Sequence, residues 1–135
     1  MVSLRVILFG CPRVSRNPDG AEVKLTRIVQ ILLAYLLLQR QRSHSREVLA
    51  GTLWSDNGQK SARACLNTAL WRLRNAIEGY AHPDSPFLLM TQHGEVRFNS
   101  SSSYWLDVEV FENLLDRLSG RDLAEVHQLA DVLDA

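Results

Sequence analysis

The segment from Lys60 to Glu78 combines the spacing of a helix with side chains that bind nucleic acid. Its apolar residues recur every three or four positions, which predicts an amphipathic helix with one buried stripe. The opposite arc is polar and basic, and the segment holds four positive charges before its first carboxylate, Glu78. The members of the apolar stripe are Ala62, Leu66, Ala69, Leu70, Leu73 and Ile77. A solvated surface helix without a ligand is the alternative for this segment taken alone.

Three side chains on the polar arc are candidates for contacts with base edges. Arginine pairs bidentately with guanine and asparagine with adenine in the major groove of DNA, which singles out Arg72 and Asn67. Thr68 lies beside them on the same arc. Trp71 is on this arc as well, where it would either stack on a sugar or pack against a neighbouring hairpin.

A second set of residues is suited to phosphates, which position a protein on DNA without reading its sequence. Lys60 lies at the helix start, and Arg63 and Arg74 lie on the borders of the polar arc. Ser45 and Arg46 begin the preceding helix, whose free N–H groups would bind a phosphate or simply be capped by the serine. In the hairpin further along the chain, Arg97 is a candidate for the minor groove.

Charge is distributed unevenly along the chain of 135 residues, although the total is zero. Residues 1–79 contain 12 Lys/Arg against 5 Asp/Glu, a net charge of +7. Residues 80–135 contain 3 against 10, a net charge of −7. This polarity favours a nucleic-acid-binding first part and a different role for the acidic second part.

Other functional classes find no support in the sequence. No Gly-x-Ser-x-Gly motif and no glycine-rich nucleotide loop occurs, and the histidines and cysteines lack the spacing of a metal site. We therefore expect no enzyme, no cofactor and no metal. The longest apolar run is eight residues, from Ile31 to Leu38, and no signal peptide is evident. We expect a soluble, cytoplasmic protein that does not associate with membranes.

Periodicity and turn residues predict a mixed set of elements. Strands are expected at Leu4–Phe9, from Val14 and at Glu22–Leu25, and they would form a small antiparallel sheet. Thr26 and Ser45 are the expected N-caps of the first two helices. The predicted helices cover Arg27 to about Arg40, Arg46–Trp54 (with Val48, Leu49, Leu53 and Trp54 facing inward), Lys60–Glu78, a helix capped by Asp107, and Asp122–Leu133. A hairpin is expected from Phe87–Thr91 and Glu95–Phe98, followed by a polar linker from Asn99 to Ser103.

Strands, three helices and then a hairpin are the element order of a winged helix-turn-helix. The predicted fold class is therefore α+β: an N-terminal antiparallel sheet, three helices, a C-terminal hairpin as the wing (about 87–98) and one or two appended helices. We place a winged-helix DNA-binding domain at 1–99, with its third helix (about 60–78) in the major groove. Residues 104–135 would begin a truncated helical activation or interaction domain.

The order and spacing of several short motifs in the chain resemble those of a known family. It is similar to the N-terminal region of SARP-type transcriptional activators, in which an OmpR-like winged helix precedes a bacterial transcriptional activation domain. The matching residues are Leu4-Arg5-Val6, Phe9-Gly10, Leu32-Leu33-Ala34-Tyr35-Leu36, Ser45-Arg46-Glu47-Val48-Leu49-Ala50, Leu53-Trp54, Ala62-Arg63, Leu66, Leu70, Leu73-Arg74, Asp107-Val108 and Phe111-Glu112. The resemblance implies sequence-specific binding of double-stranded DNA as part of a bacterial transcription regulator. It also implies a second copy of the chain on direct repeats and RNA polymerase as further partners.

One alternative from another functional class stays open. Winged helices also serve as protein–protein interaction modules, because a fold does not determine a function. The basic arc favours DNA, whereas an interaction helix would expose apolar anchors, for which only Trp71 qualifies. The acidic end carries a net charge of −6 from Asp107 onward and should not touch DNA. We expect its helices to pack on the winged helix or on a second copy of the chain.

Overall fold

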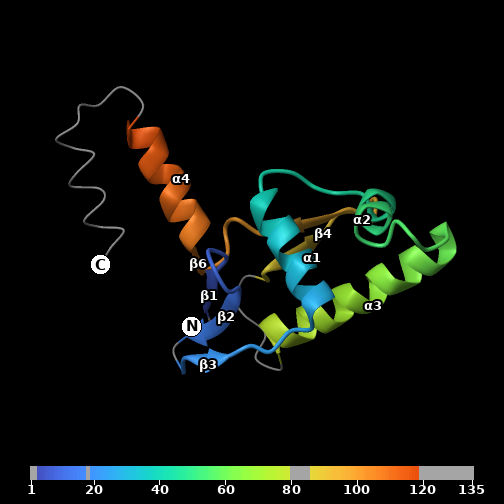
Figure 1. Cartoon of the computed structure of the whole chain (residues 1–135), viewed down its shortest axis with the longest axis horizontal. Coiled ribbons are helices and arrows are strands. Elements are labelled where there is room, and N and C mark those ends of the chain that lie inside the picture. The colour runs from blue at the N-terminus through green and yellow to red at the C-terminus, as the bar shows by residue number, and fades with distance from the viewer. Residues whose placement is uncertain (1–2, 18, 80–85, 119–135) are drawn as a thin grey trace.

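The computed structural model describes residues 3–17, 19–79 and 86–118 (Figure 1). Within these ranges the fold is α+β, as predicted, with a four-stranded sheet, a two-stranded hairpin and four helices. The elements in chain order are β1 (Ser3–Ile7), β2 (Arg13–Asn17), β3 (Ala21–Glu22), α1 (Arg27–Leu38), α2 (Arg46–Leu53), α3 (Gln59–Glu78), β4 (Leu88–Met90), β5 (Val96–Phe98), β6 (Tyr104–Leu106) and α4 (Asp107–Leu118).

The N-terminal sheet has the strand order β3-β2-β1-β6. β2 runs antiparallel to both β1 and β3, which confirms the predicted antiparallel sheet. The bounds expected for the third strand are wrong, because β3 shares only Glu22 with the expected Glu22–Leu25. β6 was not predicted, and it pairs with β1 in parallel. Leu4 and Val6 of β1 are fully buried, as expected for alternate residues on the inner face of a sheet.

Three helices supply most of the core. All six residues of the predicted stripe on α3 are buried, and α1 buries five further apolar side chains, including Leu33 and Leu36. The Ser45 Oγ accepts the backbone N–H of Val48 at 3.1 Å, which confirms the predicted cap of α2. Thr26 precedes α1 but makes no side-chain cap.

The prediction of which residues of α2 face the core is partly wrong. Val48 is 56% exposed, and Ala50 is buried in its place beside Leu49. Leu53 and Trp54 are half-buried and pack against the core. The buried side of this short helix therefore includes Ala50 in place of the predicted Val48.

The hairpin β4–β5 is fixed to the helices at both of its ends. Val96 exchanges two backbone hydrogen bonds of 2.8 Å with His44, which lies between α1 and α2. At the other end, the buried Glu78 accepts the N–H groups of Phe87 and Leu88 through its Oε1, at 3.0 and 3.3 Å. These bonds hold the hairpin beside the last turn of α3 and the beginning of α2.

The acidic helix α4 packs on the rest of the chain, as expected. The carboxylate of Asp107 accepts the N–H groups of Leu8 and Phe9, each at 3.0 Å, and so extends the contact between β6 and the end of β1. The buried Arg40, just after α1, pairs with Glu109 and Glu112 at 3.0 and 3.1 Å. These contacts join the start of the predicted second region to the first. The helix expected at 122–133 lies outside the described residues.

Tyr104 on β6 provides a test of this docking. Its hydroxyl group bonds to the Glu109 carboxylate, and burial, followed by this bond and the charge of Glu109, raises the pKa of Tyr104 to about 12 from 10.0. Because the pKa is raised in the folded state, this contribution to stability is complete below pH 10.0 and is lost as the pH rises to about 12.

Absorbance titration of tyrosinate checks this expectation. The difference between the wild type and Tyr104→Phe should contain a component that titrates near pH 12, well above an ordinary tyrosine. Tyr35→Phe is the control, and removing that hydroxyl group should leave the late component in place. If the Tyr104 component instead titrates near pH 10.0, the contact between α4 and the Tyr104 hydroxyl group does not form in solution.

Candidate nucleic-acid interface

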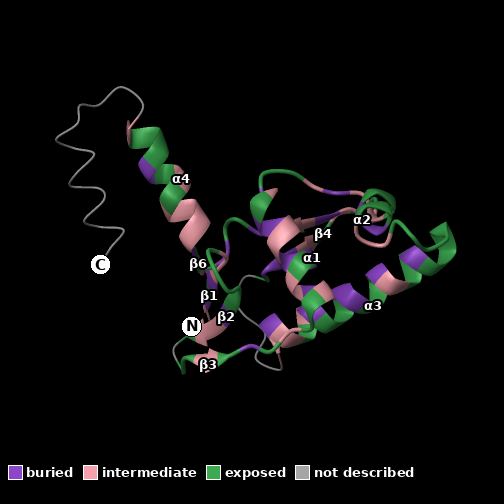
Figure 2. Ribbon diagram, viewed as in Figure 1, coloured by how far each residue is buried: buried purple, intermediate pink, exposed green. Residues whose placement is uncertain are grey.

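One side of α3 is exposed along its length, opposite the buried stripe (Figure 2). The exposed side chains there are polar or basic apart from Trp71 and Ala64, and the only carboxylate of the helix, Glu78, is buried. Five of the predicted contact residues lie on this side, whereas Arg74 is half-buried. We define the outer face of α3 as Lys60, Arg63, Asn67, Thr68, Trp71, Arg72 and Asn75.

The two arginines of the outer face lie on opposite borders of it. Arg72 lines a hollow of about 340 Å³ between α1 and α3, together with Ile28 and Cys65. Arg63 and Asn67 instead face α2 and the hairpin. Thr68 lines the same hollow as Arg72, and its Oγ1 donates to the carbonyl oxygen of Ala64 at 3.1 Å. The face therefore presents an arginine at each edge, with polar side chains and Trp71 between them.

Arg46 is bound by protein groups on three sides. Its Nε donates to the carbonyl oxygen of Gly94 in the hairpin turn at 3.0 Å, and its Nη1 donates to Oδ1 of Asn67. Its Nη2 lies 3.6 Å from the sulfur of Met90. Arg46, which the sequence predicts to bind a phosphate, therefore links α2 to α3 and the hairpin through its side chain. No local sequence pattern indicates this arrangement.

Arg74 and Arg97 also make protein contacts. The Nη2 of Arg74 donates to the carbonyl oxygen of Leu88 at 3.3 Å, and its Nε lies 3.6 Å from the Glu78 carboxylate. Arg97 on β5 is half-buried, and its Nε is enclosed by protein without a hydrogen-bond partner among the described residues. Arg74 therefore helps to fix the hairpin to α3, and its guanidinium is less accessible to a ligand than those of Arg63 and Arg72.

A hollow of about 320 Å³ lies where α2, α3 and the hairpin turn meet. Positive charge predominates there, because two arginines oppose a single carboxylate, that of Glu47. The half-buried hydroxyl group of Ser45 is occupied by its capping bond. The residues that line this hollow include Ser45, Arg46, Arg63, Asn67, His93 and Gly94.

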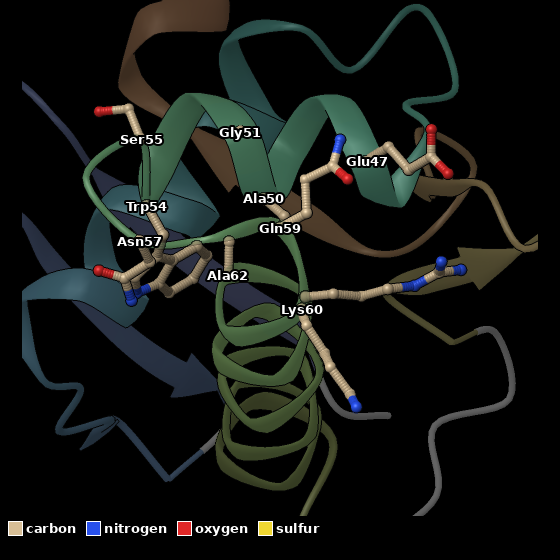
Figure 3. A pocket seen from close by; sticks show the side chains of 10 residues that line it. Glu47, Ala50, Gly51, Trp54, Ser55, Asn57, Gln59, Lys60 and Ala62 are labelled. Atoms are coloured by element: carbon tan, nitrogen blue, oxygen red, sulfur yellow. The ribbon is translucent and has the colours of Figure 1, made fainter.

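A larger hollow of about 480 Å³ lies between α2 and the beginning of α3 (Figure 3). Trp54 and Glu47 line it from the side of α2. Lys60 extends from α3 away from α2 in this view, so its ammonium group is directed away from Glu47. Lys60 is exposed and is therefore available to a phosphate.

Two other kinds of site have no counterpart in the part of the chain that the structure describes. No three histidine, cysteine, aspartate or glutamate side chains come together there as a metal site would require. None of the helices within 3–17, 19–79 and 86–118 has both the length and the apolar character needed to cross a membrane.

Comparison with known proteins finds no protein-family model that matches the chain and no curated protein with significant sequence similarity to it.

Proposed function

We propose that the chain binds duplex DNA in a sequence-specific way as part of a bacterial transcription regulator. In this proposal α3 enters the major groove, and the hairpin at about 87–98 is the wing of a winged helix-turn-helix. The observation that carries the proposal is the outer face of α3, on which every charge is positive. Such a face attracts the phosphate backbone and repels acidic surfaces.

The dimensions of α3 suit this role. A helix of 20 residues is about 30 Å long, and a major groove about 12 Å wide admits such a helix. Reading helices contact base edges chiefly through their N-terminal residues. Of the predicted base-contact residues, Asn67 and Thr68 are exposed in that half of α3, and Arg72 lies in the other half. The hairpin turn at Gly94 lies beside Asn67.

The resemblance to SARP-type activators supports the same proposal. It adds a second copy of the chain on direct repeats and RNA polymerase as partners. We also propose a cytoplasmic location for the chain. α4 would then begin the activation domain, and its docking through Arg40 and Asp107 would set its direction relative to the DNA-binding part.

A protein-interaction module is the second candidate, and one observation favours it. Trp71 is 67% exposed in the middle of the outer face, as an apolar anchor for a protein partner would be. Against this reading, Trp71 is the only large apolar side chain that α3 exposes, so no cluster of apolar anchors surrounds it. A tryptophan on this face is also able to pack against a DNA sugar.

Two substitutions on α3 should separate base reading from phosphate binding. Arg72→Ala is expected to weaken binding to a selected duplex by roughly tenfold or more and to leave a scrambled duplex little affected. Lys60→Ala should weaken both duplexes alike, because a phosphate contact carries no sequence information.

Competition assays with duplexes selected from a random pool measure both effects. Arg117→Ala, which removes an exposed arginine from the acidic helix α4, is the matched control and should change neither affinity. Equal losses on the selected and scrambled duplexes for Arg72→Ala would remove Arg72 from the base-reading set.

A further inference from the structure

The contact between Arg46 and Asn67 fixes the orientation of an exposed amide. A guanidinium group has only donors, so the Asn67 atom that faces it must be the oxygen, Oδ1. The Nδ2 group, with its two N–H donors, is then directed away from Arg46. Asn67 is exposed on the outer face of α3, so these donors are available to a ligand.

This orientation conflicts with the usual pairing of asparagine with adenine. That pairing needs Oδ1 to accept from the adenine N6 amino group while Nδ2 donates to N7. Here Arg46 already occupies Oδ1 and places further N–H groups beside it. A second donor at this oxygen would approach the positive guanidinium, whereas an acceptor would be attracted by it.

Guanine has the complementary edge. In the major groove it presents two acceptors, N7 and O6, and no donor. Resting on the proposed function, we propose that Arg46 and Asn67 form a donor-only pair that selects guanine over adenine at one base pair of the binding site. Asn67 makes the base contact, and Arg46 acts as the positioning residue.

The second bond of Arg46 makes this arrangement rigid. Its Nε donates to the carbonyl oxygen of Gly94 at 3.0 Å, so the guanidinium is held between the hairpin turn and α3. Asn67 is thereby oriented before any ligand arrives. This orientation reduces the side-chain entropy that is lost when the ligand binds. The same bond places the hairpin turn relative to the reading helix.

Selection of bound sites from random duplexes, carried out with the full chain and its variants, tests the proposal. The wild type should favour guanine at the pair that Asn67 controls, by on the order of tenfold over adenine. Asn67→Asp keeps the shape and one oxygen for Arg46 but presents an acceptor to the base. It should therefore shift the preference at that pair to cytosine, whose N4 group donates.

Asn113→Asp is the matched control, because it makes the same change at an exposed position of α4, outside the outer face of α3. It should leave the preference at that pair unchanged. Arg46→Met frees Oδ1 of Asn67 and should admit adenine at the same pair. A purely structural role of Arg46 would weaken binding without changing the preferred base.

The outcomes separate this inference from the proposed function. If the wild type enriches no duplex, DNA binding itself is wrong. If duplexes are enriched but Asn67→Asp leaves every base preference unchanged, or the controlled pair prefers adenine in the wild type, the donor-only pair is wrong and DNA binding stands. Should the aspartate variant bind no duplex, Asn67→Ala decides: loss of the guanine preference at one pair supports the inference, and an unchanged preference overturns it.

Discussion

Raising the salt concentration from 50 to 200 mM is expected to weaken binding of the chain to duplex DNA by roughly 12-fold. The figure follows from two exposed cations on α3, Lys60 and Arg63, each taken to neutralise one phosphate, whereas Arg72 is assigned to a base. Each neutralised phosphate releases counterions and contributes about −0.9 to the slope of log affinity against log salt concentration. Arg46 and Arg74 are left out of this count because protein groups bind them.

Fluorescence anisotropy at several salt concentrations measures this slope. A slope of about −2 is expected, whereas a slope of about −3 to −5 would mean that Arg72, Arg46 or Arg74 also binds a phosphate. Lys60→Ala should reduce the slope by about 1, and Arg117→Ala on α4 should not change it. Absence of binding at 50 mM salt, or binding independent of salt, would contradict the electrostatic role of α3.

Leu70→Ala should lower the free energy of unfolding by about 2–5 kcal/mol, the usual cost of deleting a buried leucine side chain. Leu70 is 3% exposed and lies in the middle of the stripe that α3 buries in the core. The cavity left behind cannot close easily, because α1 packs against the same helix and is itself rich in buried leucines.

Chemical denaturation measures the change, and Asn75→Ala serves as the control on the exposed side of the same helix. That control should stay within about 0.5 kcal/mol of the wild type. DNA affinity per folded molecule should be unchanged by Leu70→Ala. An unfolding transition that matches the wild type would show that the buried stripe is misplaced.

The sequence predicts local features of this fold well, and α3 shows why. A buried stripe and an exposed arc repeat along its 20 residues, so periodicity alone determines which side chains face the core. α2 has only eight residues, and there the expected burial of Val48 is wrong. A short helix provides too few turns to fix the direction of its buried side.

Non-local features were not predictable from the sequence. β6 is a strand of three residues whose partner, β1, lies about a hundred positions earlier, and the preceding serines indicated only a linker. The same limit applies to the candidate site. Exposure of Lys60, Asn67 and Arg72 follows from helical spacing, but the partner of Arg46 is a backbone carbonyl oxygen in a distant turn, which side-chain patterns do not reveal.

Titration of the ¹⁵N-labelled chain with a mixed-sequence duplex at low salt would locate the DNA-binding surface directly. Amide and side-chain resonances of the outer face of α3, above all those of Arg63, Asn67 and Trp71, are expected to shift together with those of the hairpin turn at Gly94. Resonances of α4 should stay in place, because that helix is acidic and docks on β1 and β6. Shifts confined to α4, or no shifts at a duplex concentration well above that of the protein, would contradict DNA binding through α3.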